Sequence, residues 1–257
     1  MRHYHGTPIG RNGKEDVATK FLTGRNVLIP YPRQDDLHVA MEVARSVIFD
    51  NGAFTIWKQG GKLDVQGYTD WCEKWHRHPR FEWALIPDVI EGTDEDNDAL
   101  LLDWPKHIAG VPVYHLHEKP ERLVRLAHEY PIVALGSSGV WQTPGSSGWW
   151  SRMATILNAV CDEDGFLICK LHGLRMLNPR LFSIPLYSAD STNAGRNGSN
   201  AERWKRGAYS PLTTWQRMSV IADRVESQQS SHRWERPQNE LMFYGQSDID
   251  PNMEPIT

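Results

Sequence analysis

Three apolar segments of this chain each end in an aspartate, and this repeat restricts the possible folds more than any other feature. Residues 47–49 run straight into Asp50, and the segments that precede Asp88 and Asp190 repeat the pattern. An unbroken apolar run that stops at turn residues is typical of a strand buried on both faces. Taken alone, Asp50 is better explained as a cap of the following turn or helix than as a site residue. Because the pattern of an apolar run ending in an aspartate occurs three times, we favour a shared position of the three aspartates at strand ends.

Eight strand-like segments alternate with mostly helical patterns along the chain. The first begins near His3, and the others lie at residues 26–30, 47–49, 83–89, 111–117, 131–139, 166–173 and 185–192. Strands alternating with helices over 257 residues predict one α/β domain, a (β/α)8 TIM-like barrel, for which ~250 residues is typical. The carboxyl ends of such strands form one rim on which active sites are built. The three aspartates are therefore expected to face one mouth.

The composition changes after the eighth strand. We expect the barrel over residues 1–198, with a loop at 193–200, where Gly, Asn and Ser are frequent. Residues 199–247 are expected to form a helical basic and aromatic extension packed on the barrel, and residues 248–257 a loosely ordered tail. Interleaved basic and aromatic side chains suit phosphates and stacked bases, but an ordinary solvated helix explains them equally well. They include Arg203, Trp204, Lys205, Arg206, Arg217 and Trp234.

Charge and cysteine content limit the class of protein. The formal net charge is −4, so any contact with nucleic acid must come from a local basic patch. Three cysteines give no paired framework, which suits a reducing cytoplasm. No apolar signal region begins the chain, and no run approaches the ~18 apolar residues of a membrane span. We therefore expect a soluble, cytoplasmic protein without membrane contact.

One group of residues invites a metal site. Cys72 and His76 are four residues apart, so they can share a helix face, and His78 follows in a basic loop. The spacing matches no standard zinc pattern, and a fourth ligand is missing. A plain surface turn explains the segment better, so neither a metal nor another cofactor is expected.

Five segments in register resemble the tRNA-guanine transglycosylase superfamily. Their counterparts in that family are the Asp-Ser-Gly-Gly-Phe motif, a base-recognising aspartate, the Ala-Leu/Ile-Gly-Gly-Leu turn, the Leu-Met-Gly-Val strand end, and the strand of the nucleophilic aspartate with its trailing Arg-Asn-Gly. Here these segments read Phe49-Asp50-Asn51-Gly52-Ala53-Phe54, Pro87-Asp88, Ala134-Leu135-Gly136-Ser137-Ser138-Gly139, Leu171-His172-Gly173-Leu174, and Ser188-Ala189-Asp190 with Gly195-Arg196-Asn197-Gly198.

The chain also departs from that family. Ala53 and Ser137 replace family glycines, and His115-Leu116-His117 stands in place of a Gln-Gly-Gly segment. The zinc motif Cys-x-Cys-x-x-Cys with a distant His, which supports tRNA docking in bacterial enzymes, is absent. A compact chain without this module is most similar to the DNA-modifying branch. Its members, the DNA-guanine transglycosylases of the DpdA type, exchange guanine for a 7-deazaguanine such as preQ0.

The resemblance implies a role for each matching residue. Asp190 would be the nucleophile that forms a glycosyl ester, and Asp50 the general acid/base. Base-binding residues would be Asp88, Gly136, Ser137, His115, His117, His172 and Phe54. Nucleic-acid-binding residues would be Arg196, Arg203, Lys205, Arg206 and Trp204. The expected partners are DNA, or tRNA, and a free 7-deazaguanine base, with a further protein to open the strand. A phage-encoded enzyme would work in the host cytoplasm.

Three other functions are compatible with the same residues. A tRNA-guanine transglycosylase that docks RNA without zinc would use the same residues. A nucleoside or glycoside hydrolase would use the same paired carboxylates and release the base to water. A barrel that binds nucleic acid without catalysis is favoured by the short chain and by the substituted Gly and Gln positions.

Overall fold

The computed structural model describes residues 1–9, 15–204, 209 and 211–236 of the chain. Nine parallel strands form one sheet in the order β5-β4-β3-β2-β1-β9-β8-β7-β6. The strands are β1 (Arg2–Gly6), β2 (Asn26–Pro30), β3 (Ser46–Asp50), β4 (Phe81–Leu85), β5 (Gly110–Val111), β6 (Val113–His115), β7 (Ile132–Gly136), β8 (Lys170–Gly173) and β9 (Ser188–Ser191).

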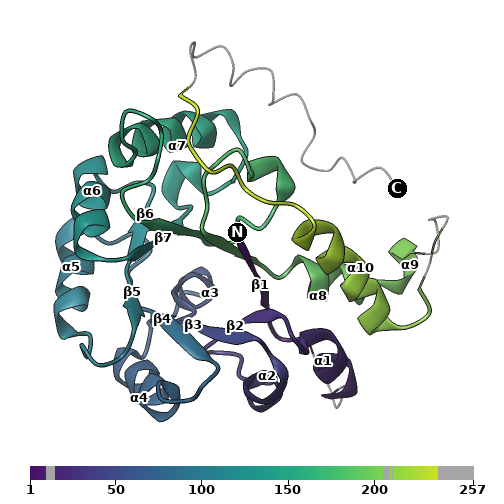
Figure 1. Cartoon of the computed structure of the whole chain (residues 1–257). Coiled ribbons are helices and arrows are strands. Elements are labelled where there is room, and N and C mark those ends of the chain that lie inside the picture. The colour runs from purple at the N-terminus through teal and green to yellow at the C-terminus, as the bar shows by residue number, and fades with distance from the viewer. Residues whose placement is uncertain (10–14, 205–208, 210, 237–257) are drawn as a thin grey trace.

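Strands β5 and β6 are two halves of one barrel strand, interrupted by Pro112. The first half pairs with β4 and the second with β7, which brings the two ends of the sheet together. Pro112 has no N–H to donate, but its carbonyl accepts from the Ala134 N–H at 2.9 Å. Eight strand positions therefore close into the ring seen in Figure 1, which confirms the predicted TIM-like (β/α)8 barrel.

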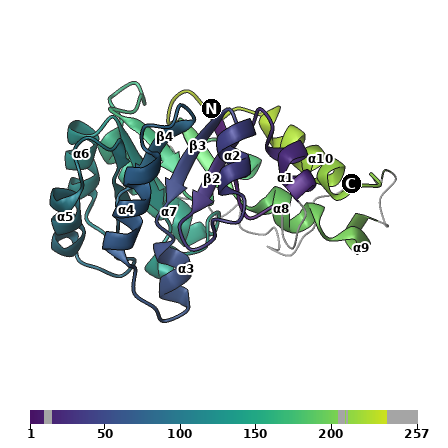
Figure 2. The same cartoon turned by 90° about the horizontal axis from the view of Figure 1, so that it is seen from below.

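Helices surround the ring (Figure 1). They are α1 (Glu15–Leu22), α2 (Leu37–Val43), α3 (Ala53–Lys58), α4 (Val65–Trp75), α5 (Asp94–Asp103), α6 (Pro120–Glu129), α7 (Ser147–Val160), α8 (Asn193–Gly198), α9 (Ala201–Trp204) and α10 (Thr214–Glu226), with short 3-10 turns η1 (Gly139–Trp141) and η2 (Pro179–Leu181). The crossover between β8 and β9 carries η2 alone. Helix α3 projects inside the ring in Figure 1 and beyond the strands in Figure 2, so it lies over the carboxyl-end mouth.

Side-chain alternation divides the core into an inner and an outer part. Inward-facing residues such as Tyr4, Ile48 and Trp83 fill the barrel, and Ala134 is the small residue opposite these large ones. The intervening residues face the helices, as Phe49 does where it stacks on Trp71 of α4 with ring centroids 3.9 Å apart. A filled barrel interior leaves the carboxyl-end rim as the place for a site.

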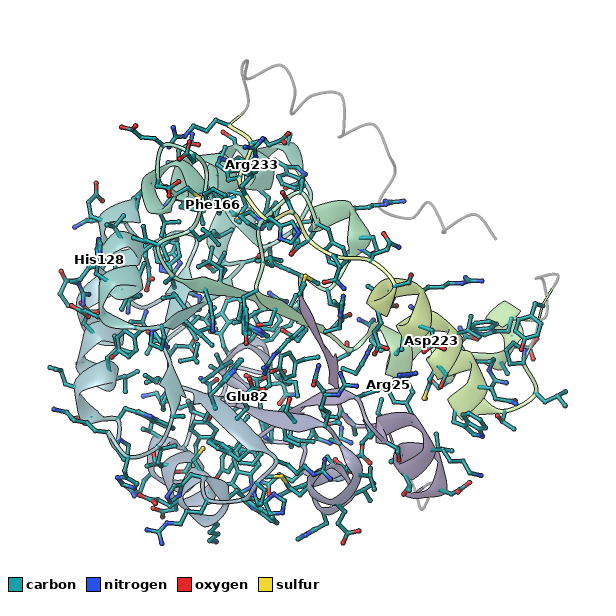
Figure 3. All side chains as sticks on the ribbon, in the orientation of Figure 1. Arg25, Glu82, His128, Phe166, Asp223 and Arg233 are labelled. Atoms are coloured by element: carbon teal, nitrogen blue, oxygen red, sulfur yellow. The ribbon has the colours of Figure 1, made fainter. Side chains whose placement is uncertain are left out.

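Helix α10 packs on α1, α8 and β1. Arg25, which follows α1, pairs with Asp223 of α10 at 2.7 Å, and Figure 3 labels the two side by side. The buried His5 ring of β1 lies 2.7 Å from Glu226 of the same helix. The amino-end floor is also polar, because Tyr4 donates to Glu82 at 2.5 Å. Glu82 lies inside the ring in Figure 3.

Two local expectations were wrong. The seventh strand begins at Lys170 rather than at Phe166, because residues before it turn outward. The Ile168 N–H donates to the carbonyl of Val160 at the end of α7, and a short antiparallel bridge joins Leu167 to Cys161. The loop expected over residues 193–200 contains α8. Buried Ala194 and Gly198 pack this glycine-containing helix against its neighbours.

Candidate active site

A cavity of about 250 Å3 opens at the carboxyl ends of the strands. Asp50, Asp88 and Asp190 all line it, although 140 residues separate the first from the last in the sequence. Asp50 ends β3, Asp88 follows β4, and Asp190 lies within β9. Phe54, His115, Gly136 and Ser137 line the same space. The expected convergence of the three aspartates is therefore present.

Asp50 sits deep in the mouth, and its local backbone requires the Asn-Gly sequence that follows it. Gly52 adopts a φ of 77°, and a Cβ built there would lie 2.4 Å from Pro32. The Gly52 N–H donates to the Asp50 carboxylate at 3.1 Å. Burial raises the pKa of Asp50 to about 7, and the charges of Asp190 and Asp88 add to the rise, while the Gly52 N–H opposes it. Such a carboxyl can both donate and accept a proton near neutral pH.

Asp88 is 8% exposed and is held from two sides. Its Oδ1 accepts from the Asn51 amide at 2.7 Å, and its Oδ2 lies 2.8 Å from His115 Nε2. The Asn51 amide also donates to the carbonyl of Ile86, which fixes its orientation. With both oxygens positioned, Asp88 presents its remaining lone pairs to the cavity as a rigid acceptor.

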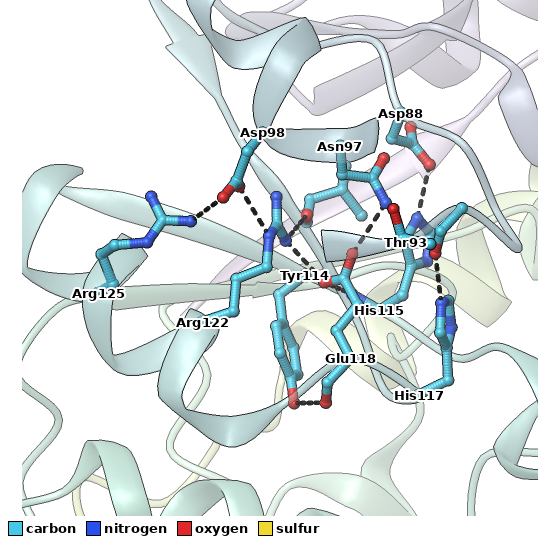
Figure 4. A network of polar contacts seen from close by, with 12 residues as sticks. Asp88, Thr93, Asn97, Asp98, Tyr114, His115, His117, Glu118, Arg122 and Arg125 are labelled. Carbon is cyan, nitrogen blue, oxygen red and sulfur yellow. Dashed lines mark hydrogen bonds and ion pairs between the residues drawn. The ribbon is translucent and has the colours of Figure 1, made fainter. Parts of the chain in front are cut away.

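His115 stands on a buried polar network that Figure 4 shows from close by. The Glu118 carboxylate accepts from the His115 N–H at 2.9 Å and from the Asn97 amide at 2.8 Å. Arg122, 4% exposed, donates to Glu118 at 2.6 Å and to Asp98 at 2.9 Å. This network ties β6 to α5 and α6, and it fixes the side of the mouth where Asp88 lies.

Gly136 allows the His115 ring to lie against β7. A Cβ at this position would lie 2.9 Å from His115 Nδ1. That nitrogen is buried and has no hydrogen-bond partner among the described residues, since Nε2 faces Asp88. Any larger residue at position 136 would push the ring away from the cavity wall.

Asp190 is 4% exposed, and its carboxylate is oriented by β8 and the turn after it. The Arg175 N–H donates to Asp190 Oδ1 at 2.9 Å. His172 Nε2 lies 3.4 Å from the same oxygen, and His172 Nδ1 lies 2.8 Å from the Ser188 hydroxyl. These contacts hold one oxygen of the carboxylate in place, and Asp190 lines the cavity.

Two residues expected to bind a base, His117 and His172, do not line the cavity. His172 is fully buried below Asp190, and His117 lies behind His115 with the two rings stacked at 5.6 Å. Both His117 nitrogens are engaged, at 2.8 Å with the Ser138 hydroxyl and at 3.0 Å with the Gly92 carbonyl. These two histidines support the site from behind. The Ser137 hydroxyl, in turn, accepts from the Trp149 indole at 3.0 Å.

The residues expected to bind nucleic acid are only partly described. Arg196 is exposed on α8, and the partly buried Trp204 of α9 donates to the Asn197 carbonyl at 3.1 Å. The Arg203 side chain, Lys205 and Arg206 lie outside the described residues, as does the tail 248–257. Two further members of the basic and aromatic series are structural. They are the buried Arg217, which donates to the Gly198 carbonyl, and the buried Trp234, which donates to Asn158.

Sequence reasoning missed two residues of the site. Asn51, beside Asp50 in the sequence, could have been found from its place in the quoted motif. Arg175 follows the predicted seventh strand, lines the cavity, and stacks its guanidinium on the Phe54 ring at 3.8 Å. Its left-handed backbone, with a φ of 59°, has no signature in the sequence.

Two further findings concern membrane-spanning helices and the grouping of metal-ligand side chains. No helix within the described residues is long and apolar enough to cross a membrane. Cys72 is buried, and within the described residues it does not come together with His76 and His78 as a group of metal-ligand atoms. A group of Glu73, His76 and His107 instead brings three ligand-type atoms within 4.8 Å of one another on the outer surface. The metal grouping suggested by the sequence is therefore not formed by those residues.

Comparison with known proteins supports the fold. No protein-family model matches the chain, and no curated protein matches it in sequence. Among solved structures, it resembles a candidate fructose-1,6-biphosphate aldolase from Coccidioides immitis, with a TM-score of 0.52 and 12% sequence identity. The match covers 88% of this chain and 89% of that chain. At this identity the likeness supports the shared TIM-like barrel and carries no information about the chemistry of this chain.

Proposed function

We propose that this protein is a DNA-guanine transglycosylase, a pentosyltransferase that exchanges a guanine in DNA for a 7-deazaguanine such as preQ0. The observation that carries the proposal is the convergence of Asp50, Asp88 and Asp190 on one cavity, each in a different environment. Base exchange with retention of the sugar configuration needs a nucleophile, a proton-transfer group and a base acceptor. The three aspartates supply one group for each task.

Asp190 takes the role of nucleophile. Its carboxylate attacks C1′ of the target nucleotide, the N-glycosidic bond breaks, and a glycosyl ester forms on Asp190. Asp50 transfers its proton to the departing guanine, which leaves as the neutral base. Burial raises the pKa of Asp50 to about 7, so a protonated form is available near neutral pH and can serve as this acid. The incoming base then returns a proton to Asp50, attacks C1′ and releases Asp190.

Asp88 takes the role of base acceptor. A guanine or 7-deazaguanine presents N1–H and an exocyclic amine on one edge, and a carboxylate accepts both. Asn51 and His115 hold the Asp88 oxygens in place before the base arrives. This preorganisation supports selection of a base with two adjacent donors over one that lacks them.

The size of the cavity supports a flipped or single-stranded target. A volume of about 250 Å3 accommodates a base but no duplex, so the nucleotide must leave the stack before it reaches Asp190. The absence from the sequence of the family's zinc motif favours DNA over tRNA. A tRNA substrate remains the alternative that the exchange assay addresses.

The fold shared with an aldolase-like protein raises a second chemistry, which the site supports less well. An aldolase that works through an imine needs a lysine at the substrate carbonyl. No lysine is among the residues that line the described cavity, whereas three carboxylates are. A hydrolase would use the carboxylates in the same way, but it would lose the base to water instead of replacing it.

Exchange of radiolabelled guanine, and of preQ0, into matched single-stranded DNA, duplex DNA and tRNA tests the proposal. We expect label in DNA with the wild type and none with Asp190→Ala, whose thermal unfolding should show an intact fold. Asp88→Asn should retain the fold and bind free guanine or preQ0 more weakly. Label in tRNA alone would assign the protein to RNA modification. Release of guanine without incorporation would assign it to the hydrolases, and full exchange by Asp190→Ala would refute the mechanism.

A further inference from the structure

Arg175 occupies an unusual position beside Asp190. It follows β8 by two residues and adopts a φ of 59°, a left-handed conformation that disfavours every residue with a side chain. Its N–H donates to Asp190 Oδ1 at 2.9 Å. A glycine would satisfy this backbone and this hydrogen bond equally well. The backbone therefore gives no reason for an arginine at this position, and the reason must lie in the contacts of its guanidinium.

The guanidinium lies in the cavity wall and is held in one orientation. It stacks on the Phe54 ring at 3.8 Å, and Nη2 donates to the Ser137 carbonyl at 3.2 Å. Phe54 belongs to α3, which covers the mouth, and Ser137 follows β7, so the group bridges two sides of the opening. Stacking fixes the plane of the guanidinium and leaves its other N–H groups for a planar, bidentate acceptor.

The charge of Arg175 is not neutralised by a direct ion pair. Within the described residues, no carboxylate oxygen lies within 4.0 Å of its guanidinium nitrogens. Arg33, the other arginine that lines the cavity, is paired with Asp35 at 3.0 Å. Three aspartates line the same mouth, and a polyanionic strand that approaches them meets repulsion. A cation placed among them offsets this repulsion where the strand must enter.

We propose that Arg175 binds a phosphodiester oxygen of the nucleic-acid strand next to the nucleotide that reacts with Asp190. This inference rests on the proposed function and adds a strand-binding residue to it. Arginine suits the task because its planar fork matches two phosphate oxygens and because it remains charged when partly buried. One contact would hold the strand at the mouth while the flipped base lies between Asp88 and Asp190.

Direct binding, without catalysis, tests the inference. The affinity for a fluorescent single-stranded DNA of mixed sequence is measured by anisotropy at several salt concentrations, for wild type, Arg175→Gly and Arg175→Lys. Glycine fits the left-handed backbone, so Arg175→Gly removes the guanidinium without disturbing the fold. Arg180→Ala is the matched control, because it removes an exposed arginine that does not line the cavity. The affinity for free guanine and preQ0 is measured on the same proteins.

We expect Arg175→Gly to bind DNA roughly tenfold more weakly or worse, as loss of a charge-assisted hydrogen bond implies. The slope of log K against log[salt] should fall by about 0.7, the value for one phosphate contact on a single strand. Arg175→Lys should keep the slope and bind at an intermediate level, Arg180→Ala should match the wild type, and no variant should change free-base affinity.

Two results would overturn the inference while the proposed function stands. One is an unchanged salt slope and DNA affinity in Arg175→Gly, which would make the residue structural. The other is a loss of free-base affinity at an unchanged slope, which would place the guanidinium on the base. A wild-type protein that binds no DNA at any salt concentration would instead contradict the proposed function itself.

Discussion

Replacing Asp50 by asparagine should stabilise the fold at alkaline pH, and this gain should shrink in acid. Burial raises the pKa of this carboxyl in the folded protein from its ordinary value of 3.8 to about 7. The native state therefore holds the proton more tightly than the unfolded chain does. Native stability falls as pH rises from about 4 to about 7, and the full cost is present above that window. Asparagine carries no charge at any pH, so it avoids the cost.

The size of the effect follows from the shift. A carboxyl pKa raised from 3.8 to about 7 corresponds to an upper limit of roughly 4 kcal/mol. Asp50 keeps some contact with water in the cavity and accepts the Gly52 N–H when ionised. A gain of about 1–2 kcal/mol at pH 8.5, relative to pH 4, is therefore expected.

Urea denaturation of wild type and Asp50→Asn at pH 4, 6 and 8.5 measures this difference. Asp103→Asn, which removes an exposed carboxyl on α5, is the control and should show no comparable pH-dependent gain. The same advantage for Asp50→Asn at every pH, or a net loss at pH 8.5, would refute the assignment of a buried, destabilised carboxylate at the end of β3.

Three further changes test the surroundings of the site. Glu118→Ala leaves the buried Arg122 without its nearest carboxylate and should lower the free energy of unfolding by about 3–5 kcal/mol in urea titrations; a loss below 1 kcal/mol would contradict the network. Gly136→Ala should displace the His115 ring and weaken free-base binding roughly tenfold by calorimetry, with unchanged binding as the contrary result. Arg175→Gly relieves about 1 kcal/mol of backbone strain but loses the stacking on Phe54 and the hydrogen bond to Ser137, so its melting temperature should stay within about 2 °C of the wild type; a shift of more than about 4 °C would contradict this.

The barrel was predictable because its signals are local and repeated. Each inner strand is a short apolar run, and each run is followed by turn residues, so the strand count and the carboxyl-end position of Asp50, Asp88 and Asp190 could be read from the chain. The predicted seventh strand began too early, at Phe166, because Phe166 and Ile168 are as apolar as strand residues, although the structure leaves both exposed.

The detailed partners in the site were not predictable in the same way. His115 and His117 look alike in the sequence, yet strand alternation turns His115 into the barrel, and the chain beyond β6 places His117 behind it. The role of Arg175 depends on one backbone dihedral and on a ring from α3, more than 100 residues away in sequence. Such contacts depend on barrel closure, which no local pattern encodes.

The proposed mechanism depends on a covalent bond between Asp190 and C1′ of the sugar, and this bond can be trapped. Wild type, Asp190→Asn and Asp50→Asn are incubated with single-stranded DNA and no incoming base, then analysed by denaturing gel and intact-protein mass spectrometry. We predict a protein–DNA adduct with the wild type, mapped to Asp190 by peptide sequencing, and none with Asp190→Asn. Base exchange that proceeds without any adduct, or an adduct mapped to another residue, would rule out Asp190 as the nucleophile.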